Sequence, residues 1–269
     1  MKLAFIGGGN MAAALLAGLK SQQFNMTDIT VIELNTDKRQ ALTQQFSVNT
    51  SDKLVDAVTC EAILLAIKPQ QLSSLAKNLA PLLSNQLIIS IAAGIRLIDL
   101  SRWLGGYRTI IRAMPNTPAQ IQAGVTGLHA MPNVSKAQIA MADQILSAAG
   151  STLWLDSEEK LDAITAISGS GPAYVFYLIE ALHEAAINLG LSETEAKQLS
   201  VATFKGASLL ADSSTMSVAT LRQQVTSKGG TTEQGLLSLE HSQVKQAMAL
   251  AAQKACERAK TLGDELGKD

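Results

Sequence analysis

The first half of the chain alternates short apolar runs with amphipathic helical stretches, and this alternation constrains the fold more than any other feature. Runs typical of buried strands are KLAFIG, ITVIEL, AILLAI, LIISIAA and TIIRAM, and helical stretches such as NMAAALLAGLK and TDKRQALTQQF lie between them. Strands that alternate with helices form mainly parallel sheets covered by helices on both faces. The sequence therefore predicts an α/β fold with a doubly wound sheet in its N-terminal half.

The pattern changes at about residue 157. GVTGLHAM and STLWL add two strands around a further helical stretch, and from there long alanine- and leucine-rich helical patterns run to the C-terminus. These helices are apolar on more than one face, which a small helical domain cannot bury by itself. We expect a sheet domain at residues 1–157 and an all-α domain at residues 158–269. We therefore expect a homodimer, whose second chain would complete the helical core; such dimers could assemble further.

Charge and composition exclude several classes of partner. The 269 residues carry a formal net charge of −1 without blocks of like charge, so neither nucleic acid nor an anionic membrane is expected to bind. Cys60 and Cys256 lie far apart and the three histidines share no motif, so no metal site is expected. The chain enters its first strand at once, and no uncharged apolar run reaches membrane-spanning length. We expect a cytoplasmic protein that binds small molecules.

The segment GGGNMA follows the first strand and opens a helix. Its pattern is G-x-G-x-x-A, in which Gly7, Gly9 and Ala12 are the three small residues and Asn10 and Met11 lie between Gly9 and Ala12. In this context the small residues allow a tight turn, a close approach of pyrophosphate to the helix N-terminus, and close packing of the helix on the sheet. The sequence predicts a Rossmann-like domain that binds a dinucleotide through these five residues.

The form of the dinucleotide stays open. Glu33 ends the second strand, where a carboxylate can bind a ribose 2′-hydroxyl and repel a 2′-phosphate, which favours NADH. Asn35, Lys38 and Arg39 follow directly and could hold the 2′-phosphate of NADPH if Glu33 points away. Both NADPH and NADH are therefore kept as candidate cofactors.

Two other segments are candidate ligand sites. Ala66, Lys68 and Pro69 follow the strand AILLAI, at the edge of the sheet where open α/β folds bind ligands. The stretch VTSKGGTTEQGLL places Gly229 and Gly230 before another helix, far from the first glycine loop. Such a loop either binds an acidic ligand on the first amides of the helix or simply separates two helices.

Three motifs identify a resemblance. The segments IRAMPNTPA (111–119), SGSGPAYVF (168–176) and VTSKGGTTEQGLLSLE (225–240) follow FIGGGNMA in this order. Together they resemble the pyrroline-5-carboxylate reductase family, and the resemblance runs nearly from end to end. It implies a Rossmann domain followed by a helical substrate-binding and dimerisation domain. It also implies reduction of the C=N bond of 1-pyrroline-5-carboxylate to L-proline by NAD(P)H, the last step of proline biosynthesis.

The resemblance also implies roles for single residues. The amides of Gly229, Gly230 and Thr231, with Ser227, would bind the substrate carboxylate. Thr232 would be the catalytic residue, because its hydroxyl would lie near the ring nitrogen; the alternative is a helix N-cap. Asn116 would shape the nicotinamide pocket, and its alternative is a residue of a proline-flanked turn.

Two departures from the family and two competing functions remain. Lys228 replaces a proline of the family's Ser-Pro-Gly-Gly loop, and Glu33 stands where many members carry small or basic residues.

A β-hydroxyacid-type dehydrogenase would need a lysine one helical turn beyond the glycines of SGSGP, where this chain has Pro-Ala-Tyr-Val. A dinucleotide sensor would need no substrate loop. The preferred ring size of the imine is left open.

Overall fold

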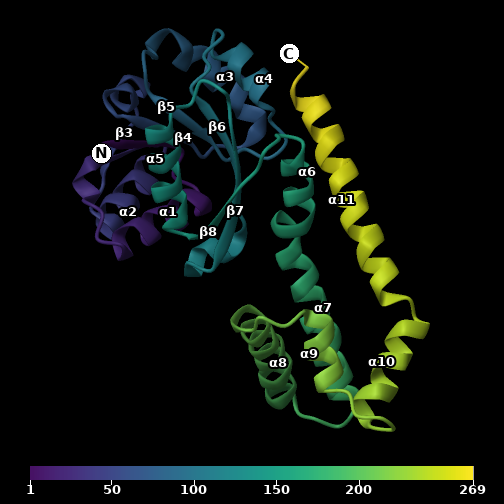
Figure 1. The fold of residues 1–269 in the computed structure, drawn as a ribbon. Helices are drawn as coiled ribbons and strands as arrows, with labels where there is room; N and C mark the ends of the chain where they lie inside the picture. Colours follow the sequence, from purple (N-terminus) through teal and green to yellow (C-terminus); the bar gives the residue numbers. More distant parts are fainter. Residues whose placement is uncertain (269) are drawn as a thin grey trace. The chain divides into compact units, whose positions relative to one another are not determined.

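The computed structural model describes residues 1–268 and contains one eight-stranded sheet (Figure 1). The strands are β1 (Leu3–Ile6), β2 (Ile29–Ile32), β3 (Asn49–Ser51), β4 (Ala62–Leu65), β5 (Leu87–Ser90), β6 (Ile110–Met114), β7 (Gly124–Ala130) and β8 (Gly150–Trp154). The helices are α1 (Asn10–Ser21), α2 (Thr36–Phe46), α3 (Pro69–Leu79), α4 (Leu97–Trp103), α5 (Lys136–Ser147), α6 (Lys160–Ile164), α7 (Gly171–Asn188), α8 (Glu193–Ser213), α9 (Val218–Gln224), α10 (Thr231–His241) and α11 (Val244–Leu266).

The strand order is β3-β2-β1-β4-β5-β6-β7-β8, and every neighbouring pair is parallel except β6 and β7. Leu3 of β1 pairs with Ile29 of β2 on one side and with Ala62 of β4 on the other. The strands that follow β1 therefore lie first on one side of it, as β2 and β3, and then on its other side, beginning with β4. The strand order reverses at β1, and doubly wound sheets bind dinucleotides at such a point. The predicted α/β fold is confirmed.

One strand was not predicted. Residues 49–51 form β3 from the polar sequence Asn-Thr-Ser, and β3 pairs only with β2 at the edge of the sheet. A short edge strand needs no apolar run, because one side of it stays open to solvent.

Helices cover both faces of the sheet. Helices α1, α2 and α5 pack on one face, and α3 and α4 pack on the other (Figure 1). The first core includes Leu3, Phe5, Leu15, Leu16, Val31, Leu64, Ile89, Ile145 and Leu146. The second core includes Ile6, Ile63, Leu65, Leu72, Leu79, Ile88, Leu100 and Trp103. The central strands are apolar on both sides for this reason, and this is why they read as continuous apolar runs in the sequence.

The chain divides into two compact units. The first contains residues 1–170 together with residues 254–269, and the second contains residues 171–253. The first unit thus includes α6, the π-helical segment η5 (Thr165–Gly169) and the C-terminal part of α11 in addition to the sheet.

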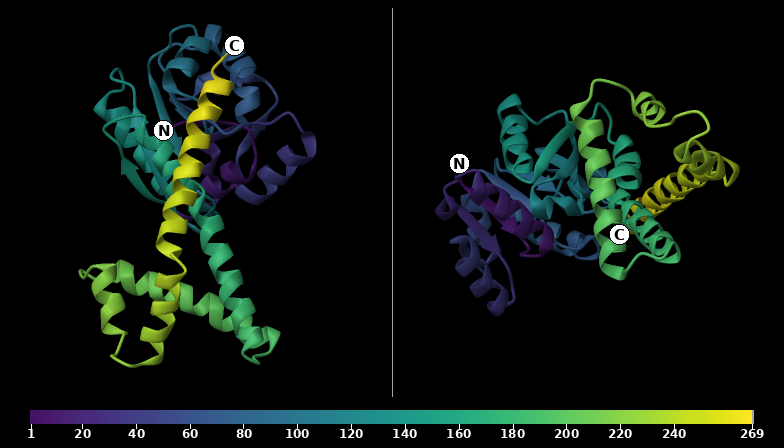
Figure 2. Two further views of the ribbon diagram at one scale, coloured as in Figure 1. Left: turned by 90° about the vertical axis from the view of Figure 1, so that its right-hand side faces the viewer. Right: turned by 90° about the horizontal axis from the view of Figure 1, so that it is seen from below.

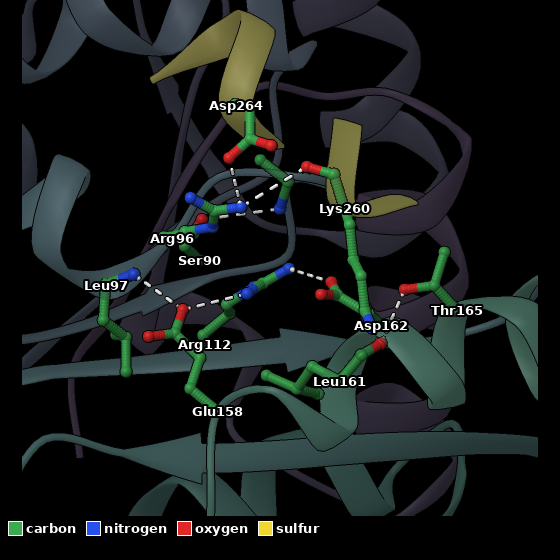
Figure 3. Close-up of polar contacts among 11 residues, drawn as sticks. Ser90, Arg96, Leu97, Arg112, Glu158, Leu161, Asp162, Thr165, Lys260 and Asp264 are labelled. Atoms are coloured by element: carbon green, nitrogen blue, oxygen red, sulfur yellow. Dashed lines mark hydrogen bonds and ion pairs between the residues drawn. The ribbon is translucent and has the colours of Figure 1, made fainter. Parts of the chain in front are cut away.

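Polar contacts hold the end of α11 within the first unit (Figure 3). Arg96, which precedes α4, places Nη2 2.6 Å from Oδ1 of Asp264 and 3.4 Å from the carbonyl oxygen of Lys260. Arg102 of α4 donates a hydrogen bond to the carbonyl oxygen of Gly267 at 2.6 Å. The last turns of α11 are therefore bound to α4 and to the segment before it.

The second unit is entirely helical, and in it α8 packs against α7 (Figure 2). Among residues 171–253, all of which the structure describes, only Ala196 and Ser200 are buried. Large apolar side chains are exposed instead, among them Phe176, Tyr177, Leu182, Leu199, Leu209, Leu210 and Leu237. These faces need a partner surface to be removed from water. Within residues 1–268, no helix has the length and apolar character needed to cross a membrane.

Candidate active site

The first glycine loop connects β1 to α1 at the C-terminal edge of the sheet. Gly7 has a φ of +101° and donates its N–H to the carbonyl oxygen of Ile32 at 2.8 Å. A Cβ added to Gly7 would lie 2.6 Å from the carbonyl oxygen of Ala66. Only glycine fits this position, because both the backbone conformation and the neighbouring backbone exclude a side chain.

The start of α1 is open for an anion. Gly9 is the N-cap and has no side chain, and the first intrahelical hydrogen bond runs from Ala13 N to Gly9 O at 2.9 Å. The N–H groups of Asn10, Met11 and Ala12 therefore have no intrahelical acceptor. No atom lies within 4 Å of a Cβ added to Gly9, whereas Ala12 is fully buried against the sheet. Open space in front of unpaired amides fits a pyrophosphate group.

The carboxylate of Glu33 binds two backbone amides. Oε2 accepts the N–H of Gly8 at 3.0 Å, and Oε1 accepts the N–H of Asn35 at 3.0 Å. Burial alone would raise the pKa of Glu33, but the hydrogen bonds from Asn35 and Gly8 and the charge of Lys38 outweigh it and lower the pKa. Glu33 thus fastens the glycine loop to the loop after β2. Gly8 was not among the predicted site residues, because its contact depends on the pairing of β1 with β2.

The loop after β2 is held by its own side chains. Asn35 is the N-cap of α2 and accepts the N–H of Lys38 at 2.9 Å. Arg39 donates from Nη1 to the carbonyl oxygens of Glu33 at 2.7 Å and Leu34 at 2.9 Å. The guanidinium of Arg39 is therefore engaged with the backbone of this loop, while Lys38 is exposed beside it.

The loop after β4 adjoins the first glycine loop. Ala66 donates its N–H to the carbonyl oxygen of Ile6 at 2.8 Å, which extends the β1–β4 ladder to the edge of the sheet. Lys68 is the N-cap of α3, Pro69 is its first residue, and the Lys68 side chain is exposed. Proline at the first helical position has no N–H that would need a partner.

Asn116 is buried beyond the end of β6. Its Oδ1 accepts the N–H of Val125 at 2.9 Å, and its Nδ2 donates to the carbonyl oxygen of Ser168 at 3.1 Å. Ser168 belongs to the π-helical segment, and such segments are frequent at functional sites. The side-chain amide of Asn116 therefore connects the loop after β6 to this segment.

The second glycine loop is a tight turn between α9 and α10. Gly230 donates its N–H to the carbonyl oxygen of Ser227 at 3.0 Å, and Gly229 has a φ of +72°. The N–H of Gly229 donates to Oε2 of Glu233 at 2.7 Å. Both glycine amides are thus already engaged, with Glu233 of α10 and with Ser227, so that of the three amides predicted to bind the carboxylate only that of Thr231 is open. Glu233 was not predicted, although its position three residues after the N-cap is the place from which acidic side chains reach back.

The first turn of α10 carries the open amides of this loop. Gly230 is the N-cap and offers no side chain, and the first intrahelical bond runs from Gln234 N to Gly230 O at 3.3 Å. The N–H groups of Thr231 and Thr232 therefore lack an intrahelical acceptor. Thr232 is the second residue of the helix and is exposed, so its hydroxyl does not cap α10. Within residues 1–268, no three His, Cys, Asp or Glu side chains gather at a place that could hold a metal ion.

Comparisons with known proteins find relatives over nearly the whole chain. Residues 158–262 match the family described as pyrroline-5-carboxylate reductase dimerisation, and residues 2–94 match NADP oxidoreductase coenzyme F420-dependent. The pyrroline-5-carboxylate reductase of Pseudomonas aeruginosa is 42% identical over 268 residues, which cover 97% of this chain and 98% of that protein.

Solved structures give the same result. A pyrroline-5-carboxylate reductase from Coxiella burnetii is 39% identical, with a TM-score of 0.93 over 97% of this chain and 98% of that chain. The Plasmodium falciparum pyrroline carboxylate reductase, solved with NADP bound, is 30% identical, with a TM-score of 0.87 over 98% of both chains. The sequence identity, the coverage and the shared fold establish that this chain belongs to the pyrroline-5-carboxylate reductase family.

Proposed function

We propose that the two glycine loops of this chain bind the two reactants of one reduction, in which a hydride passes from NADPH or NADH to the C=N bond of 1-pyrroline-5-carboxylate and gives L-proline. One observation carries the proposal: α1 and α10 each begin after a glycine loop with unpaired amides. Each helix start suits one anion, the pyrophosphate at α1 and the carboxylate at α10. A dinucleotide sensor would account for the first loop alone, and a β-hydroxyacid-type dehydrogenase would lack its lysine.

The cofactor end uses residues at the C-terminal edge of the sheet. Bound there, the dinucleotide supplies the hydride. Gly7, Gly9, Asn10, Met11 and Ala12 provide the turn and the amides that hold its pyrophosphate. Glu33 and Asn35 border the adenosine ribose, Ala66, Lys68 and Pro69 line the neighbouring strand end, and Asn116 supports the nicotinamide side.

The substrate end uses the loop before α10. The open amides of Thr231 and Thr232 bind the carboxylate, while Ser227, Gly229 and Gly230 shape the turn that leads to them. The Thr232 hydroxyl serves the ring nitrogen as a hydrogen-bond partner or proton relay. A protonated imine accepts hydride more readily than a neutral one, so a group that stabilises the proton on nitrogen lowers the barrier.

The assembly is a homodimer formed through the helical unit, with association of dimers into larger particles as a further step. The exposed apolar faces of α7 and α8 support this, since isolated chains would leave them in water. Sedimentation velocity at micromolar concentration tests it. A species of one chain mass with full activity would contradict it.

The activity is tested by oxidation of NADPH and of NADH with the imines, and by reduction of NADP+ and of NAD+ with the hydroxyacids. A panel of 1-pyrroline-5-carboxylate, a six-membered piperideine carboxylate and a set of hydroxyacids separates the candidate functions. We expect 1-pyrroline-5-carboxylate to be reduced by NADPH or NADH, and the hydroxyacids to give no turnover. Oxidation of hydroxyacids with reduction of NADP+ or NAD+, without imine reduction, would support the dehydrogenase, and no turnover with tight cofactor binding would support the sensor.

A further inference from the structure

The turn that precedes α10 lacks a restraint from its own sequence. Residues 227–230 form a β-turn closed by the hydrogen bond from Gly230 N to Ser227 O. Lys228, at the second position, does not have a positive φ, whereas Gly229, at the third, has a φ of +72°. This combination is typical of a type II turn, which favours proline at the second position because the ring fixes φ. Lysine provides no such restraint.

Glu233 provides a restraint from outside the turn. Its Oε2 accepts the N–H of Gly229 at 2.7 Å, and the side chain comes from the first turn of α10. A hydrogen bond to a charged acceptor is stronger than a neutral one, and a negative charge in the first helical turn is favourable toward the helix dipole. The hydrogen bond thus connects Glu233 of the helix to Gly229, the residue of the turn that has the left-handed conformation.

We infer that Glu233 is a positioning residue for the substrate loop. Its carboxylate holds Gly229 in the type II conformation, and this keeps the amides of Thr231 and Thr232 in the arrangement that binds an anion. Because Glu233 occupies the Gly229 amide, the substrate does not use that amide. The identity of the anion rests on the proposed function, but the ordering of the loop by Glu233 does not.

Trypsin tests the ordering of the loop without any substrate. The bond after Lys228 lies within the turn, and trypsin cleaves only where the chain can open. The intact homo-oligomer is digested under native conditions, and mass spectrometry follows the cleavage after Lys228. This cleavage should be about fivefold faster in Glu233→Ala than in the wild type, as expected for the loss of one hydrogen bond. Glu233→Gln keeps an acceptor oxygen and should lie between the two.

Glu195 offers a matched control in the same unit. Its Oε2 accepts the N–H of Ser192 at 2.8 Å, so it makes the same kind of reach-back bond at the start of α8. Glu195→Ala should lower the melting temperature as a lost cap does, and leave cleavage after Lys228 unchanged. Equal cleavage in Glu233→Ala and the wild type would overturn the inference.

Kinetics then test the effect on the substrate. Glu233→Ala should raise KM for 1-pyrroline-5-carboxylate about fivefold, with kcat within about twofold of the wild type, because the loss concerns binding. Lys228→Pro should restore KM in the Lys228→Pro/Glu233→Ala double variant, since proline supplies the missing φ restraint. A lowered KM in Glu233→Ala would show that Glu233 competes with the substrate and would overturn the inference, as would a double variant without rescue.

The two proposals fail in different ways. If the wild-type protein does not reduce the imine, the proposed function fails, and the trypsin rates still decide whether Glu233 orders the loop. If Glu233→Ala does not fold, Glu233→Gln provides the trypsin comparison, and the double variant, which lacks the cleavage site at Lys228, provides the KM comparison. Intermediate cleavage in Glu233→Gln with wild-type cleavage in Glu195→Ala supports the inference, and equal rates in all variants contradict it.

Discussion

Nη1 of Arg112 lies 2.8 Å from Oε1 of Glu158, and its Nη2 lies 3.6 Å from Oδ1 of Asp162 (Figure 3). The Arg112 side chain is only 6% exposed, and the same oxygen of Glu158 accepts the N–H of Leu97 at 2.8 Å. One buried cation therefore joins β6, the start of α4 and α6. Because the partners are two carboxylates, removal of Arg112 would leave two negative charges close together without compensation.

The Arg112→Met variant should be strongly destabilised for this reason. We expect the free energy of unfolding to fall by about 3 kcal/mol or more, as found when one partner of a buried ion pair is removed. Urea denaturation measures the change. Arg258→Ala is the control, because Arg258 pairs with Glu265 on an exposed surface and such pairs contribute little. Similar stability losses in the two variants would contradict the assignment.

Glu33 should determine the choice between the two cofactors. Glu33→Ser should shift the ratio of kcat/KM values toward NADPH by about tenfold, because a charge that repels a 2′-phosphate is removed. KM should also rise for both cofactors, since the Gly8 N–H loses its acceptor. Glu33→Gln keeps an acceptor and should change the ratio with a smaller rise in KM. An unchanged ratio in both variants would mean that the carboxylate faces away from the 2′ position.

Glu33 should also contribute to stability in a defined pH range. Its pKa in the folded protein is lowered from the ordinary value of 4.5 despite burial, owing to the amides of Asn35 and Gly8. A lowered pKa stabilises the fold above the unfolded-state value, and the contribution is lost as the pH falls through the folded-state value. The difference in melting temperature between the wild type and Glu33→Gln should therefore be largest near neutral pH and shrink below about pH 4.5. A constant difference would argue against this linkage.

The parts of the fold that the sequence predicts are those with local signals. Continuous apolar runs mark the central strands because both faces of these strands are buried, and the first glycine motif marks a turn whose geometry excludes side chains. The three-residue strand β3 has no such run, since it is defined by its pairing with β2. Its existence depends on tertiary structure alone.

The same distinction applies to the contacts of the site. Glu33 and Gly8 are 25 residues apart, and Arg112 and Glu158 are 46 residues apart, so their contacts follow from the sheet topology. The bond between Glu233 and Gly229 is local and belongs to a known helix-start pattern. A helix start at Gly230 predicts that Glu233 reaches back toward the loop, but it does not predict that the bond ends on Gly229, one residue before the N-cap.

Gly230 should be intolerant of a branched side chain. A Cβ at this position would lie 2.5 Å from Oγ and 3.0 Å from the carbonyl oxygen of Ser227. Gly230→Val should therefore distort the turn and mainly raise KM for the imine. Gly235→Ala is the control within α10, because no atom lies within 4 Å of the added Cβ and alanine favours a helix by up to about 1 kcal/mol. A wild-type KM in Gly230→Val would exclude the loop from substrate binding.

Thr232→Ala should separate catalysis from binding. If the hydroxyl serves the ring nitrogen mainly in the transition state, kcat should fall by about tenfold to a hundredfold while the binding of NADPH and NADH stays intact. The helix-cap interpretation predicts instead a loss of about 1 kcal/mol in stability with normal turnover. Gly230 is the N-cap of α10 and no side chain caps this helix, which argues against the helix-cap interpretation. Thr220→Ala controls for the loss of a threonine hydroxyl on the neighbouring helix α9, where Thr220 Oγ1 lies 2.9 Å from Ser217 Oγ. Thermal melting and steady-state kinetics on the same samples decide: a lowered melting temperature with wild-type kcat in Thr232→Ala would remove this residue from the mechanism.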